Sequence, residues 1–480
     1  MSDNEIELYV NRDYRKNEKA WLKYRAFYEG DHDTLVNSPD YFWIHPKERS
    51  AEIADLLKLR KQRTRYLNIP EIILSIWGSF FFRRAPVLDK VAIDYLAGAE
   101  NDIDGRGNSI QSFIKEYAFN YFLYGRAITL IDKLPFQSRS RAEEIAANLR
   151  PIFISIDPLS VMDWSYNFSD PQKFGKFQFI RNEYQFVPER SDETVRPQVI
   201  YASDSRFINE SGQYALRRYT KETAENSKWA LDGEPIITEL TELPLVEMRD
   251  DSWLKDSIEE TQRHFNLRSM KDHIEFNQGY QKIFIIGRDR IDDDEAKGIN
   301  EYIWSLLPDG CSVQVIEPIN TDTLKDSIGE ALNSAFKVGL NQLRLLQSDS
   351  KAVQAEGSIL AEKDDRIALV ESTISQFQDA LNQMLDYYAM FQGDSEFPGT
   401  VTLASDFNES DVTKFVNLYT IFREDFKANP EANTTAFKKA LSEMGFAPDD
   451  LKNIYSLLEK GVAEPAISAP VNDVLGEALA

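Results

Sequence analysis

The hydrophobic positions late in the chain repeat with a strict heptad spacing. Steps of three and four residues place eight apolar side chains on one face of a helix. They are Ile367, Val370, Ile374, Phe377, Leu381, Met384, Tyr388 and Phe391. The pattern predicts a helix from Ser358 to Gln392, roughly 50 Å long at about 1.5 Å per residue. A seam so long and narrow is typical of a helix that spans a large domain or packs along a neighbouring subunit, and we expect one chain to be insufficient to cover it.

Apolar patterns in the first half of the chain predict helices followed by antiparallel strands. We expect helices over 1–30, 51–65, 70–82 and 110–124. Alternating and β-branched runs predict strands over 127–132, 152–156, 176–184, 196–202 and 213–219. A last run, 229–240, also alternates but is broken by Gly233 and Pro235. Helices first and strands afterwards indicate an α+β body, so the predicted fold class is α+β and helix-rich.

Beyond Pro244 the pattern predicts long helices separated by a small module of strands and a helix. Asp250, Asp251 and Ser252 cap a very polar helix that runs to Gln281 with only a partial apolar stripe. The module follows as a strand over 282–287, a helix over 292–307 and a strand over 311–317. The remaining predicted elements are a helix over 325–346, the heptad helix, a strand over 400–407 and short helices over 410–460.

Charge and cysteine content narrow the functional classes. The chain has 480 residues, with 79 acidic and 55 basic side chains and a formal net charge of −24. Proteins that hold DNA through its phosphates are basic at least locally, so this chain either avoids nucleic acid or lets DNA pass without holding it. The single cysteine, Cys311, excludes a disulfide within the chain and fits a reducing compartment. The longest apolar stretch, 72–82, is too short to cross a bilayer, and we expect no membrane partner.

The sequence carries no catalytic, cofactor or metal signature. Walker A, GxGxxG, GxSxG, HExxH and CxxC patterns are all missing. The run Asp292, Asp293, Asp294 and Glu295 resembles a divalent-metal site, but acidic residues also favour a helix N-terminus, which is the interpretation we adopt. His264 and His273 are nine residues apart and point in opposite directions on a helix. We therefore expect no enzyme, no cofactor and no metal site.

The order of predicted parts, together with short local phrases, resembles the portal proteins of tailed bacteriophages. The phrases are Arg65-Tyr-Leu-Asn-Ile-Pro70, Trp77-Gly78, Phe82-Arg-Arg-Ala-Pro86, Phe122-Leu-Tyr-Gly-Arg126, Arg150-Pro-Ile-Phe, Asp157-Pro158, Asp163-Trp164 and Ala355-Glu-Gly-Ser358. The resemblance covers nearly the whole chain, and the order of the phrases is more specific than any one of them. That family has no catalytic motif, so no catalytic residue is carried over.

The resemblance implies a division of the chain into named parts. They are a wing (1–250), a first stem helix (251–281), a clip (282–320), a second stem helix (321–346), a tunnel loop (347–358), a long wing helix with a returning strand (359–409), and a helical crown with a C-terminal tail (410–480). The tunnel loop has few apolar residues to anchor it, and we expect it to be mobile.

The same resemblance implies a ring, usually of twelve copies, at the portal vertex of a capsid. The ring would belong to the virion and would be assembled in the host cytoplasm. Double-stranded DNA would pass through it during packaging and ejection. The other implied partners are the terminase large subunit, a head-completion or adaptor protein, and the major capsid or scaffold protein.

Two sets of residues are candidates for these roles. Lys325, Lys337, Arg344 and Lys351 are candidates to face DNA in the channel, although a plain surface role or an intersubunit salt bridge explains each equally well. The run from Asp292 to Glu295 is the candidate docking site for a motor or adaptor. Two alternative functions remain open: another structural virion component such as a minor head protein, and a metal-dependent nucleic-acid enzyme.

Overall fold

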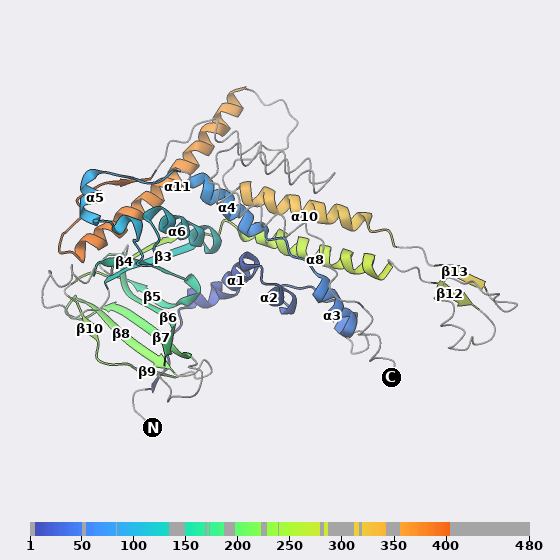
Figure 1. Ribbon diagram of the computed structural model, residues 1–480, viewed down its shortest axis with the longest axis horizontal. Helices are drawn as coiled ribbons and strands as arrows, with labels where there is room; N and C mark the ends of the chain where they lie inside the picture. The colour runs from blue at the N-terminus through green and yellow to red at the C-terminus, as the bar shows by residue number, and fades with distance from the viewer. Residues whose placement is uncertain are drawn as a thin grey trace. The chain divides into compact units, whose positions relative to one another are not determined.

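The computed structural model places most of the chain in regular elements (Figure 1). It describes residues 5–49, 54–82, 84–133, 149–168, 170–171, 173–186, 197–221, 228–238, 240–278, 283–286, 312–315, 319–341 and 356–403. The chain divides into two compact units. Unit 1 comprises Met1–Glu29, Asn68–Ile258 and Ala335–Ala480, and unit 2 comprises Gly30–Leu67 and Glu259–Ser334. The division into wing, stem, clip and crown stays a prediction.

The helices of unit 1 begin and end where local capping groups favour it. They are α1 (Arg12–Glu29), α4 (Ile69–Phe81), α5 (Lys90–Leu96), α6 (Ile110–Tyr124) and α11 (Glu356–Met390), with the first residues of α8 and the last of α10. The side chain of Asn68 accepts a hydrogen bond from the Glu71 N–H at the start of α4. Gly125 ends α6 in the left-handed conformation, with a φ of 68°. The predicted helices over 70–82 and 110–124 are confirmed.

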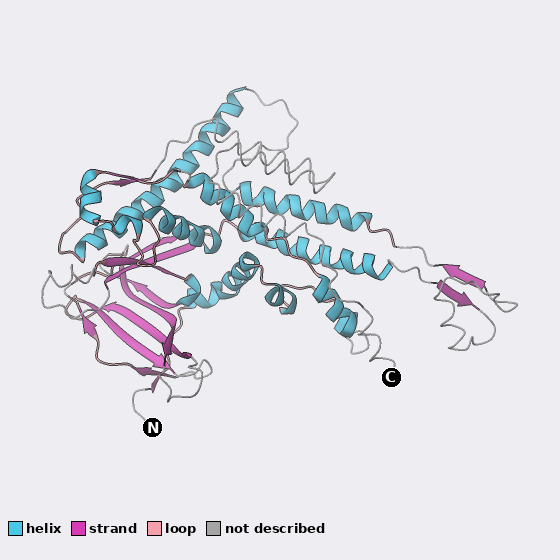
Figure 2. Ribbon diagram, viewed as in Figure 1, coloured by secondary structure: helices cyan, strands magenta, loops and turns pink. Residues whose placement is uncertain are grey.

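Two antiparallel sheets form the β part of unit 1, drawn in magenta in Figure 2. The larger sheet has the order β1-β9-β8-β7-β6-β5, with β10 also paired to β8. Its strands are β1 (Glu5–Ile6), β5 (Val161–Tyr166), β6 (Phe174–Phe186), β7 (Pro197–Ile208), β8 (Tyr214–Lys221), β9 (Trp229–Leu231) and β10 (Ile236–Ile237). The smaller sheet has the order β11-β3-β4, formed by β3 (Arg126–Lys133), β4 (Pro151–Ile156) and β11 (Leu245–Arg249). A short pair joins β2 (Val87–Leu88) to β14 (Val401–Thr402).

The mixture of helices and antiparallel sheets confirms the α+β class, with local corrections. The run over 229–240 forms two short strands, β9 and β10, separated by the segment that holds Gly233 and Pro235, as the sequence indicated. Strands β5 and β11 were not predicted. The residues of β11 read Leu-Val-Glu-Met-Arg and are buried from Leu245 to Met248 apart from Glu247, so the alternation of a half-buried strand is absent.

The structure confirms the heptad helix as α11, but other parts of the same chain cover its apolar face. Within α11, the side chains of Val370, Ile374, Phe377, Leu381, Met384 and Tyr388 are all at most 3% exposed. The Phe377 ring lies 5.7 Å from Tyr121 and 5.8 Å from both Phe82 and Phe122, measured between ring centroids. The expectation that this seam needs a neighbouring subunit is therefore wrong over these positions, because the sheet β11-β3-β4, with aromatic side chains from α6 and from the residue after α4, supplies the partner surface. The side chain of Ile367 lies outside the described set.

Unit 2 is built on α8 (Lys255–Gln278) from Glu259 onward and on α10 (Asp322–Asn341) up to Ser334. It also holds α2 (His32–Asn37), a 3₁₀ turn over Pro46–Arg49, α3 (Ala54–Arg63), β12 (Ile283–Ile286) and β13 (Ser312–Val315). Strands β12 and β13 pair antiparallel, with Ile283 opposite Val315, which confirms both strands predicted for the small module. The helix predicted between them lies outside the described residues.

The other predicted boundaries are partly covered by the structure. Helix α11 begins at Glu356, so the last three positions of the predicted loop over 347–358 are helical, and the loop's remaining positions are not described. The short helices predicted over 410–460 are not described either. Over the described part of the chain, no helix is both long enough and apolar enough to span a membrane.

The turn at Gly125 yields a prediction about stability. A Cβ atom on Gly125 would lie 2.2 Å from the Asp250 carbonyl oxygen and 2.6 Å from the Ser252 nitrogen, both main-chain atoms. We expect Gly125→Ala to lower the free energy of unfolding by about 3 kcal/mol, combining left-handed strain with overpacking. Gly212→Ala is the matched control, because Gly212 has a φ of +77° and no atom within 4 Å of its Cβ position. Urea unfolding should show a loss of only about 1 kcal/mol there, and equal losses would contradict the close approach at Gly125.

Candidate functional site

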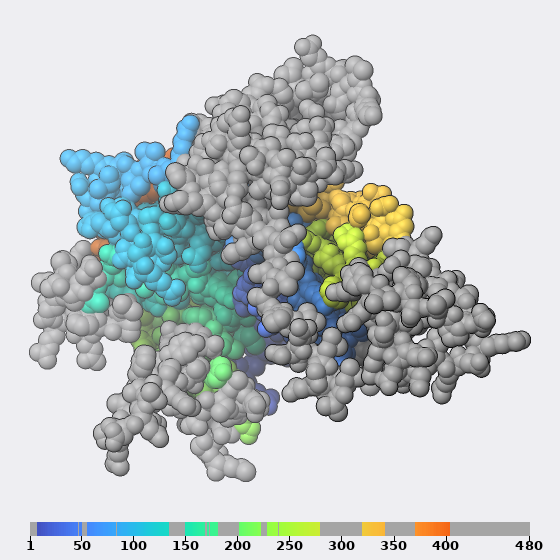
Figure 3. Space-filling model, turned by 45° about the vertical axis from the view of Figure 1, so that its right-hand side comes forward, coloured from blue at the N-terminus to red at the C-terminus, as the bar shows by residue number. Residues whose placement is uncertain are grey.

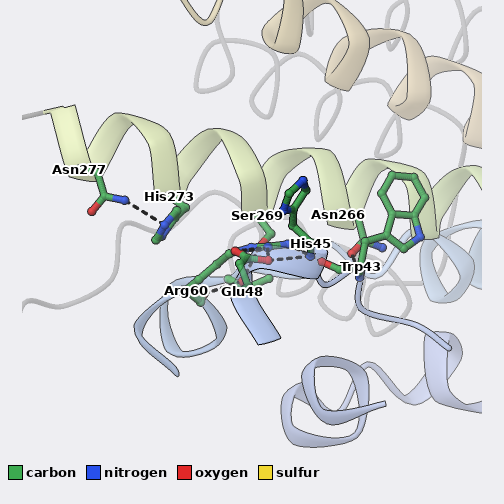
Figure 4. Close-up of polar contacts among 9 residues, drawn as sticks. Trp43, His45, Glu48, Arg60, Asn266, Ser269, His273 and Asn277 are labelled. Carbon is green, nitrogen blue, oxygen red and sulfur yellow. Dashed lines mark hydrogen bonds and ion pairs between the residues drawn. The ribbon is translucent and has the colours of Figure 1, made fainter. Parts of the chain in front are cut away.

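The most distinctive polar arrangement in unit 2 is a row of side chains along one face of α8. Gln262, Asn266, Ser269 and His273 recur at steps of three and four residues, and we call these four residues the polar stripe. The exposed fraction is 7% for Gln262, 0% for Asn266 and 1% for Ser269. Figure 4 shows that the stripe faces side chains from the segment 43–60. A buried polar face needs hydrogen-bond partners, and residues 40–64 provide them.

Two amide side chains of the stripe hold a stretch of chain that has no regular structure. Gln262 Nε2 donates to the carbonyl oxygens of Asp40 at 2.7 Å and Tyr41 at 3.1 Å. Asn266 Nδ2 donates to the Tyr41 carbonyl at 2.9 Å, and its Oδ1 accepts from the Trp43 N–H at 2.7 Å. Main-chain groups that a sheet or helix would otherwise satisfy are therefore bonded to side chains of α8. Each such bond, if left unmade in a buried position, costs about 1–3 kcal/mol.

Arg60 of α3 is the charged centre of the network and is only 3% exposed. Its Nη1 donates to both carboxylate oxygens of Glu48, at 2.7 and 2.6 Å. Its Nη2 donates to the Trp43 carbonyl at 2.8 Å and its Nε to Ser269 Oγ at 3.1 Å. All three guanidinium nitrogens thus have acceptors, which compensates for the desolvation of a buried cation.

The electrostatics of this site favour the charged form of Glu48. Burial alone would raise its pKa, but hydrogen bonds from Arg60 and from the His45 N–H, with the positive charge of Arg60, lower the pKa below its ordinary value. A carboxylate whose pKa is lowered by folding stabilises the protein above its ordinary pKa, and this contribution is lost as the pH falls. The Glu48–Arg60 pair is therefore fully formed at neutral pH.

Two histidines on α8 are held neutral by their surroundings. His264 is buried on the side of α8 away from the stripe, and burial followed by the charge of Arg268 lowers its pKa to about 3. Burial also lowers the pKa of His273, helped by the charge of Arg60 and opposed by Glu48. The Nδ2 of Asn277 lies 2.9 Å from His273 Nε2. Protonation of either imidazole would place a further cation near arginine side chains.

The network is a structural clamp, in which His273 Nδ1 is a buried nitrogen without a hydrogen-bond partner among the described residues. The groups at its centre bond to one another and to the main chain. In the described ranges there is no group of three or more His, Cys, Asp or Glu side chains that could hold a metal ion. What the arrangement can do is fix α3 and the segment over 40–48 against α8.

The candidate channel cations are not brought together in the described structure. Lys325 is exposed on α10 in unit 2, and its Nζ lies 3.5 Å from Asp322 Oδ1. Lys337 is also exposed on α10, twelve residues further along the helix and in unit 1. The ion pair with Asp322 offsets the charge that Lys325 would present to DNA. Arg344, Lys351 and the run from Asp292 to Glu295 lie outside the described residues.

The sequence carried a signal for the clamp that the apolar analysis overlooked. Helix α8 has only a partial apolar stripe, but Gln262, Asn266, Ser269 and His273 repeat with the helical period. A polar stripe at this period indicates a buried polar face as readily as a solvated one. Arg60 carried no such signal, because it lies among Lys58, Lys61 and Arg63 with nothing to distinguish it.

Comparisons with known proteins return distant structural likenesses. No family model and no curated protein matches the chain. One similar solved chain belongs to the neck of a native GTA particle computed with C12 symmetry, with 10% identity, a TM-score of 0.36, and coverage of 82% of this chain and 94% of that one. Another belongs to the neck of an empty GTA particle computed with C6 symmetry, with 10% identity, a TM-score of 0.37, and coverage of 78% and 89%.

The buried pair predicts a large effect of a conservative substitution. Arg60→Lys keeps a positive charge but cannot reach Glu48, Trp43 and Ser269 together, so we expect a loss of about 3 kcal/mol in unfolding free energy. Arg263→Lys is the matched control on α8, because Arg263 makes an exposed contact of 3.4 Å with Glu330. That change should cost less than about 0.5 kcal/mol in urea unfolding. Similar losses for the two variants would contradict the clamp.

The neutral histidine predicts a pH dependence. The imidazole of His264 takes up a proton near pH 6.5 in the unfolded chain but only near pH 3 in the folded chain. Its contribution to the free energy of unfolding is therefore complete above about pH 6.5 and decreases as the pH falls toward 3. Between pH 6.5 and pH 5 this amounts to a loss of about 2 kcal/mol. His264→Gln should be less stable than the parent at pH 7.5 and should lose about 2 kcal/mol less on moving to pH 5.

Urea unfolding at the two pH values measures this difference. A His264→Gln variant whose stability falls in parallel with the parent would show that His264 is not the titrating group.

Proposed function

We propose that this protein is the ring-forming subunit of a portal, the head-to-tail connector of a phage-like particle. In this proposal twelve copies form the ring at one vertex of the capsid. Double-stranded DNA passes through the ring in packaging and ejection. The protein acts as a channel and docking platform and performs no catalysis.

The order of elements along the chain carries the proposal. An α+β body is followed by α8, the strand pair β12–β13, α10 and then α11 with the returning strand β14. In the portal family, which the sequence resembles, this is the order of wing, stem helix, clip, stem helix and wing helix. Forty-three positions separate the last residue of α8, Gln278, from the first of α10, Asp322. Within them the structure describes the strand pair and residues 319–321. Two long helices that flank a small strand module are what a stem and clip require.

The charge of the chain supports a channel more than a DNA-holding protein. At a net charge of −24 per copy, a ring would repel DNA except at local cationic positions. Lys325, Lys337, Arg344 and Lys351 are the positions we propose for weak contact with phosphates. Weak contact is required, because many tight phosphate contacts would hold the DNA in place.

The clip is the proposed docking site for partners. In this proposal the acidic run from Asp292 to Glu295 contacts the terminase large subunit during packaging and a head-completion or adaptor protein afterwards. The wing contacts the major capsid or scaffold protein. Assembly takes place in the host cytoplasm before the ring enters the virion.

The test is the assembly state of the purified full chain. We expect particles many times heavier than the 55.2 kDa monomer by light scattering at micromolar concentration, and rings with a central hole by negative-stain microscopy. A monomer or dimer at these concentrations would contradict the portal proposal. Assemblies without a central hole would favour a minor head protein, and Mg²⁺-dependent cleavage of DNA would favour a nucleic-acid enzyme.

A further inference from the structure

The strongest unassigned feature of unit 2 is a cationic surface on and just after α3. Residues 56–67 contain Lys58, Arg60, Lys61, Arg63 and Arg65 and no acidic residue, in a chain of net charge −24. Arg60 turns inward to the clamp, whereas Lys58 is exposed and the other three are half-buried. Lys58 and parts of three further cations are therefore accessible on this segment. Such a concentration of charge, in so acidic a protein, indicates an acidic partner.

Apolar side chains lie among these cations. On α3 the exposed fraction is 42% for Leu56 and 38% for Leu59. On α8, Phe276 is 43% exposed, and the Arg63 guanidinium carbon lies 3.3 Å from the centroid of its ring. Phosphates cannot desolvate leucine, whereas a protein surface can. The mixture of leucine, phenylalanine and cations therefore fits a protein partner better than DNA.

Helix α10 presents the complementary charge within the same unit. Asp322, Asp326 and Glu330 follow one another at steps of four residues and form an acidic row along one side of the helix. Asp322 and Glu330 also make exposed ion pairs within the copy, with Lys325 at 3.5 Å and Arg263 at 3.4 Å, and exposed pairs of this kind are weak. The exposed fraction of the side chain is 72% for Asp322 and 71% for Glu330. Atoms of α10, in yellow, lie at the surface in Figure 3.

The two faces lie on different sides of α8, so one copy cannot bring them together. The polar stripe of α8 contacts Arg60 and residues 40–43, on the side that carries α3. Residues outside that stripe contact the α10 side: Arg263 reaches Glu330 at 3.4 Å, and Glu275 accepts a hydrogen bond from Thr321 at 3.0 Å. Figure 1 shows the same order, with α8 between α3 and α10.

We propose that the cationic α3 face of one copy binds the acidic α10 face of the next copy. The two patches differ, so the contact is heterologous, and a heterologous contact repeated around an axis closes into a ring. The occupant of the α3 face is thus a second copy of this chain. The inference rests on the proposed ring and identifies the surfaces that join its subunits.

Reversal of each face, separately and together, tests the contact. The α3 variant carries Lys58→Glu, Lys61→Glu and Gln62→Glu, which change the charge of this face from +4 to −1. The α10 variant carries Asp322→Lys, Thr323→Lys and Asp326→Lys, which change the charge of the acidic row from −3 to +2. Each should raise the chain concentration needed to half-fill the ring by about tenfold or more, because like charges then face each other. The variant with all six changes should recover assembly, since both faces are reversed in every copy. Arg12→Gln with Arg15→Glu and Lys16→Glu, at exposed positions on α1 of unit 1, is the control, with the same change in formal charge, −5, as the α3 variant.

Mass photometry gives the ring fraction, and urea unfolding checks that each variant is folded. Folded single-face variants that assemble like the parent would overturn the proposed contact, as would a variant with all six changes that assembles no better than either alone. A different outcome is that the parent forms rings and the α3 variant assembles normally but retains less DNA. The face would then bind phosphate, and the proposal would be wrong. A parent chain that never forms rings would instead contradict the portal function itself, so the two failures are distinguishable.

Discussion

The arrangement of unit 2 depends on one requirement: irregular main chain that is buried must find hydrogen-bond partners. Residues 40–43 have no helix or sheet to satisfy their peptide groups, and the amides of Gln262 and Asn266 supply the partners. The Arg60–Glu48 pair then fixes α3 to the same face of α8. An apolar face on α8 would bury as much area but would leave these carbonyl and N–H groups unpaired. The polar stripe of α8 is therefore polar because it is buried against main-chain groups that need hydrogen-bond partners. Its polarity does not indicate exposure to solvent.

Much of the fold could be predicted where the local signals were complete. Helix α6 was expected over 110–124 and has those bounds, because Ser109 caps its start and Gly125 its end. The heptad seam of α11 was also read correctly as a buried face. Its partner could not be predicted, because Phe82, Tyr121 and Phe122 lie more than 240 residues earlier, and only the tertiary fold brings them to Phe377. Strand β11 was missed because it lacks the regular alternation of a half-buried strand. In β5 the residues from Met162 to Tyr166 do alternate between apolar and polar, and this signal was overlooked.

The candidate site was less predictable than the fold for the same reason. The stripe on α8 has a helical period that could have been recognised, but its burial depends on residues 40–64, which lie some two hundred positions away. Glu48 and Arg60 are ordinary surface residues by type, and only their contact within hydrogen-bond distance distinguishes them from their neighbours. Of the channel cations named from sequence, Lys325 forms an ion pair with Asp322. This pair could have been predicted, because an acidic residue three positions before a lysine on a helix lies next to it.

The composition of unit 2 from two distant segments has a consequence for biosynthesis. Residues 30–67 leave the ribosome long before residues 259–334, with the whole of 68–258 made in between. At synthesis rates of about 5–20 residues per second, the first segment waits roughly 10–40 s for α8. During that interval its leucines and its row of cations have no native partner, whereas most of unit 1's strands are already complete. The nascent chain should therefore be exposed to chaperones, proteases and cellular polyanions in this stretch until α8 is made, and unit 1 is completed later still, because it needs residues 335–480.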